Sequence, residues 1–226
     1  MDKQLAMKAL NRAKTSSPKR NFNQSVDMII TLKDLDLKKP DNQVDFFTQL
    51  HFSRGKEVKI CGLVGPELKE NSTKELDFTI NADQFVDYAK DKKAIKKIAE
   101  EFDFFIAQGN LMGKVAQTFG RVFGPRNKMP NPKSGAVVTP NANLAQVRDR
   151  LKMTVRVTAK TSLQYQTLVG KSDMKDEEVV DNIMTIYDQL IHHLPGEKNN
   201  IKSIFLKTTM GPAIKVGSDK NEVAEK

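Results

Sequence analysis

The residues of this chain that could bind phosphate groups do not have the spacing that nucleotide-binding loops require. The nearest candidate for a P-loop is residues 109–115, GNLMGKV, which has three residues between its glycines where a P-loop has four. Val115 also stands where a P-loop has Ser or Thr to bind magnesium. No GxGxxG motif follows a predicted strand. The sequence therefore predicts neither kind of phosphate-binding loop.

The groups that commonly act as general acids, bases or nucleophiles have simpler explanations. His192 and His193 lie at the end of a predicted helix, where a cationic side chain interacts favourably with the negative helix terminus. Three acidic residues, 176–178, open the same helix, and a solvated first turn explains them better than a catalytic cluster. Cys61 lies in an apolar run with no histidine near it in sequence, which favours a buried thiol over a nucleophile. We predict that the chain is not an enzyme.

The sequence also gives no support for a metal site, an intramolecular disulfide bond or a membrane-spanning helix. The chain has one cysteine and three histidines, so it can form no intramolecular disulfide and has no cluster with metal-ligand spacing. No apolar run approaches the roughly 18 residues that a membrane-spanning helix needs. We expect no metal, no cofactor and a cytoplasmic location.

The charge of the chain favours a polyanionic partner, although solubility alone would also explain it. Lys and Arg number 37 against 28 Asp and Glu, which gives a net charge of +9. The excess is uneven, because residues 157–226 hold 9 basic and 10 acidic residues. Bulk charge therefore does not say which part of the chain binds such a partner.

The densest cationic loop is GRVFGPRNKMPNPKSG, residues 120–135, in which Gly and Pro could hold basic side chains outward toward phosphate. The candidate contacts in it are Arg121, Arg126, Lys128 and Lys133. The alternative is a rigid, solvated loop that only organises its own domain. Both interpretations stay open at the level of the sequence.

The hydrophobic pattern predicts a β-rich segment at each end of the chain and an α/β segment between them. After a short basic helix at 3–14, the runs 26–32 and 44–52 have strand character, and we expect them to pair. Short apolar runs at 58–64, 78–80 and 103–107 then alternate with helices such as 91–102, which is typical of a parallel sheet. Regular structure is expected to stop over residues 120–140, which contain four prolines and three glycines.

The β-rich pattern returns after a predicted helix at 142–151. Strands are expected at 154–160, 163–169 and 201–210, with a long helix at 176–191 before the last of them. Side chains alternate along a strand, so Ser203 and Thr209 share one face of the last strand, opposite Ile204 and Leu206. This order predicts one domain built from both ends of the chain with a second domain inserted into it.

Four motifs in this order resemble the archaeal branch of the ribosomal protein L-one family. They are GKVAQTFGRVFGPRNKMPNPKSG at 113–135, TTMGP at 208–212, FNQSVDMIITL at 22–32 and LVGK at 168–171. The resemblance covers nearly the whole chain. It implies an α/β protein of two domains: a split α/β domain of residues 1–66 and 157–226, and an inserted Rossmann-like three-layer domain of residues 67–156.

The resemblance also implies a function. Members of this family bind large-subunit rRNA at the mobile stalk beside the tRNA exit site, assist release of deacylated tRNA, and repress translation by binding their own mRNA. By this resemblance the chain is a cytoplasmic, ribosome-associated protein, monomeric within the ribosome, with rRNA, its own mRNA and exit-site tRNA as partners. The alternative, suggested by the doubly wound pattern, is a nucleotide- or protein-binding module that uses the inserted domain.

The family's RNA contacts can be carried over to matching positions of this chain. They are Thr209, Met210, Gly211, Ser203, Phe22, Ser25, Lys160 and Thr161. Hydroxyl groups on a strand face can reach RNA 2′-hydroxyls and phosphates, and Gly211 permits close backbone approach. Each position also has a plainer explanation, such as β propensity for Thr209, core packing for Met210 and a turn for Gly211 with Pro212. Asn21 stands where many members have a basic residue.

Overall fold

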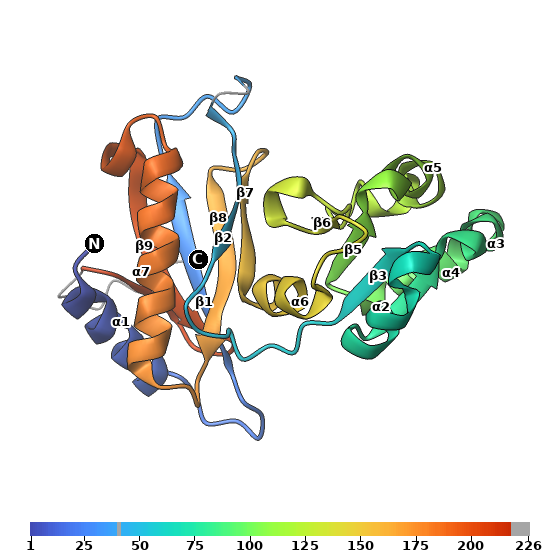
Figure 1. The fold of residues 1–226 in the computed structure, drawn as a ribbon. Helices are drawn as coiled ribbons and strands as arrows, with labels where there is room; N and C mark the ends of the chain where they lie inside the picture. The colour runs from blue at the N-terminus through green and yellow to red at the C-terminus, as the bar shows by residue number, and fades with distance from the viewer. Residues whose placement is uncertain (40–41, 218–226) are drawn as a thin grey trace. The chain divides into compact units, whose positions relative to one another are not determined.

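The computed structural model describes residues 1–39 and 42–217 of the chain, which divides into two compact units (Figure 1). Unit 1 consists of Met1–Lys56 together with Val155–Lys226, and unit 2 is Glu57–Thr154. The sequence placed the first boundary after residue 66, but the structure places it after Lys56. The reason is that the strand at Ile60–Val64 pairs with two strands of unit 2. Residues 218–226 of the predicted split domain lie outside the described residues.

Unit 1 combines a four-stranded antiparallel sheet, a two-stranded sheet and two long helices. The four-stranded sheet has the order β10-β9-β1-β8, and the smaller one pairs β2 with β7. The prediction that the first two β-rich runs pair with each other is wrong, because β1 lies between β8 and β9. The elements are α1 (Lys3–Thr15), β1 (Ser25–Leu32), β2 (Val44–Gln49), β7 (Thr154–Ala159), β8 (Gln164–Lys171), α7 (Asp176–His193), β9 (Ile201–Thr208) and β10 (Ala213–Lys215).

One face of the four-stranded sheet packs against α1 and α7, which lie side by side (Figure 1). Alternate residues of β1, such as Met28 and Ile30, are fully buried against Leu10 of α1 and Ile183 of α7 in a single apolar cluster. Burying such side chains stabilises a fold by about 1.5–3 kcal/mol each. The intervening residues of β1 are only half-buried, so the sheet keeps a second face free for other contacts.

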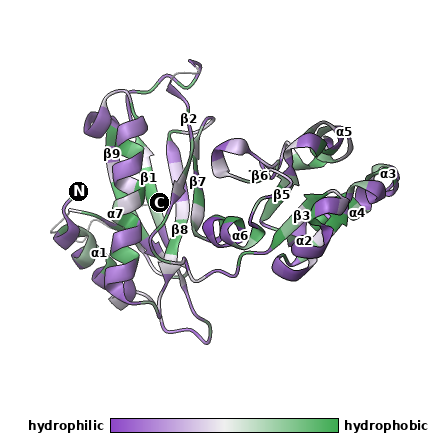
Figure 2. Cartoon of the chain, viewed as in Figure 1, coloured by the Kyte–Doolittle hydropathy of each residue, from purple (hydrophilic) through white to green (hydrophobic). Residues whose placement is uncertain are grey.

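Unit 2 is a parallel sheet of order β4-β3-β5-β6 with helices on both faces, as the sequence predicted. Along β5, Phe105 belongs to an apolar cluster with α3, α4 and α5, whereas Ile106 belongs to a second cluster with α6 and with Leu68 and Leu76, the residues that flank α2. Both β3 and β5 are drawn largely green in Figure 2, as expected for strands buried on both faces. The strands of unit 2 are β3 (Ile60–Val64), β4 (Phe78–Asn81), β5 (Phe104–Gln108) and β6 (Val137–Val138). Its helices are α2 (Lys69–Glu75), α3 (Phe85–Lys90), α4 (Lys92–Glu101), α5 (Met112–Phe123) and α6 (Leu144–Met153). Short 3-10 turns lie at Pro66–Leu68, Ala82–Gln84, Gly109–Leu111 and Pro132–Ser134 in this unit and at Glu197–Asn200 in unit 1.

Helix α5 extends further than the sequence predicted. Regular structure was expected to stop at Gly120, but α5 continues to Phe123. Phe119 and Phe123 stack at a centroid distance of 5.2 Å, and Phe123 also contacts Phe105 of β5 at 4.1 Å. Aromatic packing against the sheet therefore outweighs the weak helix propensity of Gly120.

Gln108 closes the carboxyl edge of the unit 2 sheet between its two central strands. Its side chain is 1% exposed, and its Oε1 accepts a hydrogen bond of 2.9 Å from the backbone N–H of Gly65, just after β3. Its Nε2 donates to Glu67 Oε2, also at 2.9 Å. One amide side chain thus joins the ends of β3 and β5.

Replacing Gln108 with Ala should lower the free energy of unfolding by about 2 kcal/mol, because the buried N–H of Gly65 would lose its acceptor. Urea denaturation measures this change. The control is Glu67→Ala, which removes only the exposed partner of the same amide and should cost much less. Equal losses in the two variants would contradict a structural role for the Gly65 contact.

Candidate nucleic-acid interface

The second face of the unit 1 sheet presents hydroxyl, cationic and aromatic side chains. Residues that alternate with the core positions are half-buried in both β1 and β9, and they include Ser203, Phe205 and Lys207 of β9. Thr31 pairs with Ser203 across the two strands, and Asp27 pairs with Lys207. The period of two predicted from the sequence is therefore confirmed, and we refer to this surface as the open face.

The electrostatics of the open face are mixed rather than strongly positive. Burial raises the pKa of Asp27, while the nearby cations Lys207 and Lys171 act in the opposite direction. Lys171 also donates a hydrogen bond of 2.9 Å to the Ser25 hydroxyl, which fixes that side chain at the end of β1. Hydroxyl groups held in place are therefore a more specific feature of this end of the sheet than its charge.

Thr209 is joined to the first residue of β1 by reciprocal contacts. The Thr209 N–H donates to the Ser25 carbonyl at 3.1 Å, and the Ser25 N–H donates to Thr209 Oγ1 at 3.0 Å. These bonds place two predicted contact residues side by side, although they are far apart in sequence. Thr209 Oγ1 also donates to the Ser25 carbonyl at 3.5 Å, and each of the two hydroxyl oxygens keeps a lone pair that can accept a hydrogen bond from a ligand.

The turn after β9 is held from behind, which leaves Met210 directed outward. The Met210 N–H donates to Gln24 Oε1 at 3.0 Å, and the Met210 side chain is 50% exposed. Gly211 is packed tightly, since a Cβ there would lie 2.3 Å from Thr208 Oγ1. Core packing for Met210 is thus excluded, and glycine is required at 211 by close contact within the protein itself.

Phe22 is another exposed apolar residue near the start of β1, with 52% of its surface accessible. It precedes Ser25 by three residues and lies in the same pocket lining as Thr208, which adjoins Thr209. The structure therefore brings together five of the predicted contacts at one end of the sheet. We call them the turn cluster: Phe22, Ser25, Thr209, Met210 and Gly211.

The other three predicted contacts lie at the opposite end of the sheet. Ser203 is six residues from Thr209, or about 20 Å along the strand at roughly 3.3 Å per residue. Lys160 and Thr161 precede β8, whose first residue pairs with Thr31 at the same end as Ser203. The carried-over residues thus form two groups at the two ends of β1 rather than one compact site.

Lys160 is held by an ion-pair cluster. Its Nζ lies 2.7 Å from Asp45 Oδ2, and the same carboxylate receives two hydrogen bonds from Arg156, at 2.8 and 3.0 Å. Hydrogen bonding to Arg156 and Lys160 lowers the pKa of Asp45 to about 2 against the opposing effect of burial. Asp45 therefore fixes the position of Lys160 and neutralises part of its charge.

Three residues that support the turn cluster from behind were not singled out from the sequence. Gln24 and Thr208 are buried polar residues behind the turn, at 7% and 1% exposure, and Ser17 hydrogen-bonds to both of them. Gln24 and Thr208 fall inside the FNQSV and TTMGP motifs, but a sequence motif does not separate contact residues from those that support them.

The basic loop of unit 2 has a structural role for two of its four candidate contacts. Lys128 Nζ donates to the carbonyls of Ala99 and Phe102, both at 2.7 Å, and so caps the end of α4. Arg126 donates to Glu100 Oε1 at 2.8 Å, on the same helix. Arg121 and Lys133 are exposed. The loop therefore organises its own domain through Arg126 and Lys128, which leaves Arg121 and Lys133 as the candidates for nucleic-acid contact.

Unit 2 does not offer a preformed nucleotide site where its fold would place one. In doubly wound sheets ligands bind at the carboxyl edge where the strand order reverses, here between β3 and β5. The Gly65 N–H, which could bind a phosphate there, is occupied by Gln108. Burial raises the pKa of the Cys61 thiol on β3, which is consistent with an unreactive side chain.

Metal binding and membrane spanning were also expected to be absent, and the described residues bear on both. Over residues 1–39 and 42–217, no group of three or more His, Cys, Asp and Glu side chains could hold a metal ion. No helix in these ranges is both long enough and apolar enough to cross a membrane.

Comparison with known proteins gives a consistent result over nearly the whole chain. The family model described as the Ribosomal protein L1p/L10e family matches residues 12–212. A protein of Methanobrevibacter smithii named large ribosomal subunit protein uL1 is 42% identical over 214 residues, covering 94% of this chain and 99% of that protein. Proteins of the same name from Thermococcus kodakarensis and Methanocaldococcus jannaschii are 38% and 37% identical, covering 95% and 97% of this chain and 98% of each relative.

The Asp45 cluster generates a prediction about pH. The folded-state pKa of Asp45 is about 2, below the value of about 3.9 for Asp in an unfolded chain. Ionised Asp45 therefore stabilises the folded protein above about pH 4, and this stabilisation is lost as the pH falls toward 2. Asp45→Asn should be less stable at neutral pH and show a flatter decline in acid, by urea denaturation at a series of pH values. The control is Asp34→Asn, whose carboxylate is 79% exposed. Parallel pH curves for wild type and Asp45→Asn would exclude this role.

Proposed function

The chain belongs to the ribosomal protein L1p/L10e family, and on that basis we propose that it is a constituent of the large ribosomal subunit that binds large-subunit rRNA through unit 1. Proteins of this family are ribosomal components and not enzymes, and the chain is likewise not an enzyme. The observation that carries the proposal is the turn cluster, in which the Ser25 and Thr209 hydroxyls lie beside the exposed side chains of Met210 and Phe22.

The chemistry of the turn cluster suits folded RNA better than a particular base sequence. The Ser25 and Thr209 hydroxyls can exchange hydrogen bonds with RNA 2′-hydroxyls and phosphate oxygens, and Met210 and Phe22 supply apolar surface for ribose and base. A rigid arrangement of this kind recognises shape, because its polar atoms are held at fixed separations. Net charge adds attraction and salt dependence without deciding the position of the RNA.

Ser203, Lys160 and Thr161 extend the proposed interface along the open face. Their separation of about 20 Å from Thr209 corresponds to several nucleotides of a folded RNA, at a strand rise of roughly 3.3 Å per residue. Arg121 and Lys133 of unit 2 are a proposed secondary nucleic-acid contact. Both are exposed, unlike the half-buried Lys128.

Two finer roles are part of the proposal. The first is assistance to the release of deacylated tRNA, with the protein mounted on the mobile stalk beside the tRNA exit site. The second is repression of its own translation, by binding a structure in its mRNA that resembles the rRNA site. Both roles rest on family membership, and the second requires one surface to recognise two RNAs of similar shape.

Thr209→Ala combined with Met210→Ala should weaken binding to large-subunit rRNA by at least about tenfold, equivalent to about 1.4 kcal/mol. Loss of a hydroxyl contact and of apolar contact area explains the effect. A filter-binding assay measures it, and the leader of the protein's own mRNA should lose affinity in parallel.

The matched control for this double variant is Val86→Ala, which truncates a 63% exposed apolar side chain of unit 2. Circular dichroism checks that each variant keeps its fold. If the double variant bound rRNA as tightly as Val86→Ala does, the assignment of the turn cluster would be wrong. Loss of rRNA binding with unchanged mRNA binding would contradict the proposal of one shared surface.

A further inference from the structure

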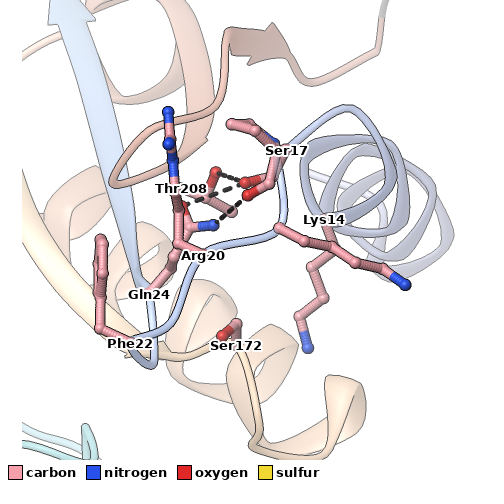
Figure 3. Close-up of a pocket in the computed structure, with 9 residues that line it drawn as sticks. Lys14, Ser17, Arg20, Phe22, Gln24, Ser172 and Thr208 are labelled. Atoms are coloured by element: carbon pink, nitrogen blue, oxygen red, sulfur yellow. Dashed lines mark hydrogen bonds between the residues drawn. The ribbon is translucent and has the colours of Figure 1, made fainter.

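A pocket of about 380 Å³ lies beside the turn cluster, between the end of α1 and the start of β1 (Figure 3). Pockets of this size commonly hold small organic ligands. The lining comes from the last turn of α1, the α1–β1 connection, the turn before α7 and the end of β9. Its residues are Lys14, Ser17, Pro18, Lys19, Arg20, Phe22, Gln24, Ser172 and Thr208.

The floor of the pocket is a closed set of hydrogen bonds that joins it to the turn cluster. The Gly211 N–H donates to Thr208 Oγ1 at 3.1 Å, Thr208 Oγ1 donates to Ser17 Oγ at 2.9 Å, and Ser17 Oγ donates to Gln24 Oε1 at 3.1 Å. Gln24 Nε2 donates to the Pro18 carbonyl at 2.8 Å. The polar groups of the floor are therefore already hydrogen-bonded to one another before a ligand binds. The floor can fit a ligand by shape, but it offers few free donors or acceptors that would distinguish one base from another.

The rim of the pocket combines cations with an aromatic ring. Lys19 and Arg20 are exposed and make no ion pair or hydrogen bond within residues 1–39 and 42–217, whereas Lys14 is paired with Asp176. Phe22 lines the pocket and is 52% exposed. An exposed ring, unpaired cations and a polar floor together match a nucleotide, which has a base that stacks, phosphates and a ribose.

We propose that this pocket receives one nucleotide of the bound RNA that has left its helical stack, with its base against Phe22 and its flanking phosphates at Lys19 and Arg20. The inference rests on the proposed function, because it assumes that the adjoining turn cluster binds RNA. It adds a second mode of contact, in which a single unstacked nucleotide anchors the RNA at the edge of the sheet.

The first experiment measures rRNA affinity across a series of KCl concentrations. Lys19→Gln combined with Arg20→Gln should lower the slope of log affinity against log salt by about 1.5, as expected for two lost phosphate contacts. The control is Lys3→Gln combined with Lys8→Gln, which removes the same charge from exposed positions of α1 outside the pocket. That control should leave the slope nearly unchanged.

The second experiment fills the pocket without changing its charge. Ser172→Leu should weaken rRNA binding about tenfold, as expected for one lost stacked base, with the salt slope unchanged. Ser172→Ala is the control, since it loses the same hydrogen bond to Asn23 but leaves the pocket open. If Ser172→Leu does not fold by circular dichroism, Phe22→Leu replaces it, because it removes the ring and keeps an apolar side chain.

The outcomes separate this inference from the proposed function. If the Thr209 and Met210 variant loses rRNA affinity while both pocket variants bind as their controls do, the pocket proposal is overturned and the function stands. The inference is also overturned if Lys19→Gln with Arg20→Gln lowers the salt slope while Ser172→Leu binds rRNA with full affinity. In that case the rim cations would contact phosphates without a nucleotide inside the pocket. If the Thr209 and Met210 variant binds normally, the proposed function itself fails.

Discussion

The pairing of β1 with both β8 and β9 is the constraint on which the rest of unit 1 depends. Strand β1 is formed by residues 25–32, but both of its neighbours come from beyond residue 163. Unit 1 can therefore form only when the two ends of the chain meet, and closing a long loop costs entropy that grows slowly with loop length. Burial of β1 beneath α1 and α7 opposes that cost. The same pairing places Ser25 beside Thr209, so the candidate interface is a direct result of the topology.

The candidate interface depends on fixed hydroxyl and backbone groups more than on charge. The final part of the chain, residues 157–226, holds 9 basic and 10 acidic residues, yet it contributes Thr209, Met210 and Gly211. The hydrogen bonds around Gln24 and Ser25 hold that turn against the start of β1. A long-range positive potential raises the rate and salt dependence of association, whereas fixed short-range contacts define where the RNA lies.

The sequence predicts the class of fold and the two faces of each strand better than it predicts which strands pair with each other. The period of two correctly placed Ser203 opposite Ile204 and Leu206, because strand geometry is local. It did not predict that β2 pairs with β7, since register and partner depend on distant strands. For the same reason the apolar run at 58–64 was assigned to the wrong side of the boundary. The supporting roles of Gln24, Lys128 and Asp45 come from contacts that arise only in the folded chain.

Oxidative footprinting of the full chain, free and bound to large-subunit rRNA, tests the central claim most directly. Phe22 and Met210 of unit 1 are 52% and 50% exposed, and Phe78 and Val86 of unit 2 are 41% and 63% exposed, so hydroxyl radicals can modify all four side chains in the free protein. We expect rRNA to protect Phe22 and Met210 while Phe78 and Val86 react as before. Unchanged oxidation of Phe22 and Met210, with protection at Phe78 or Val86, would contradict an RNA interface at this end of the unit 1 sheet.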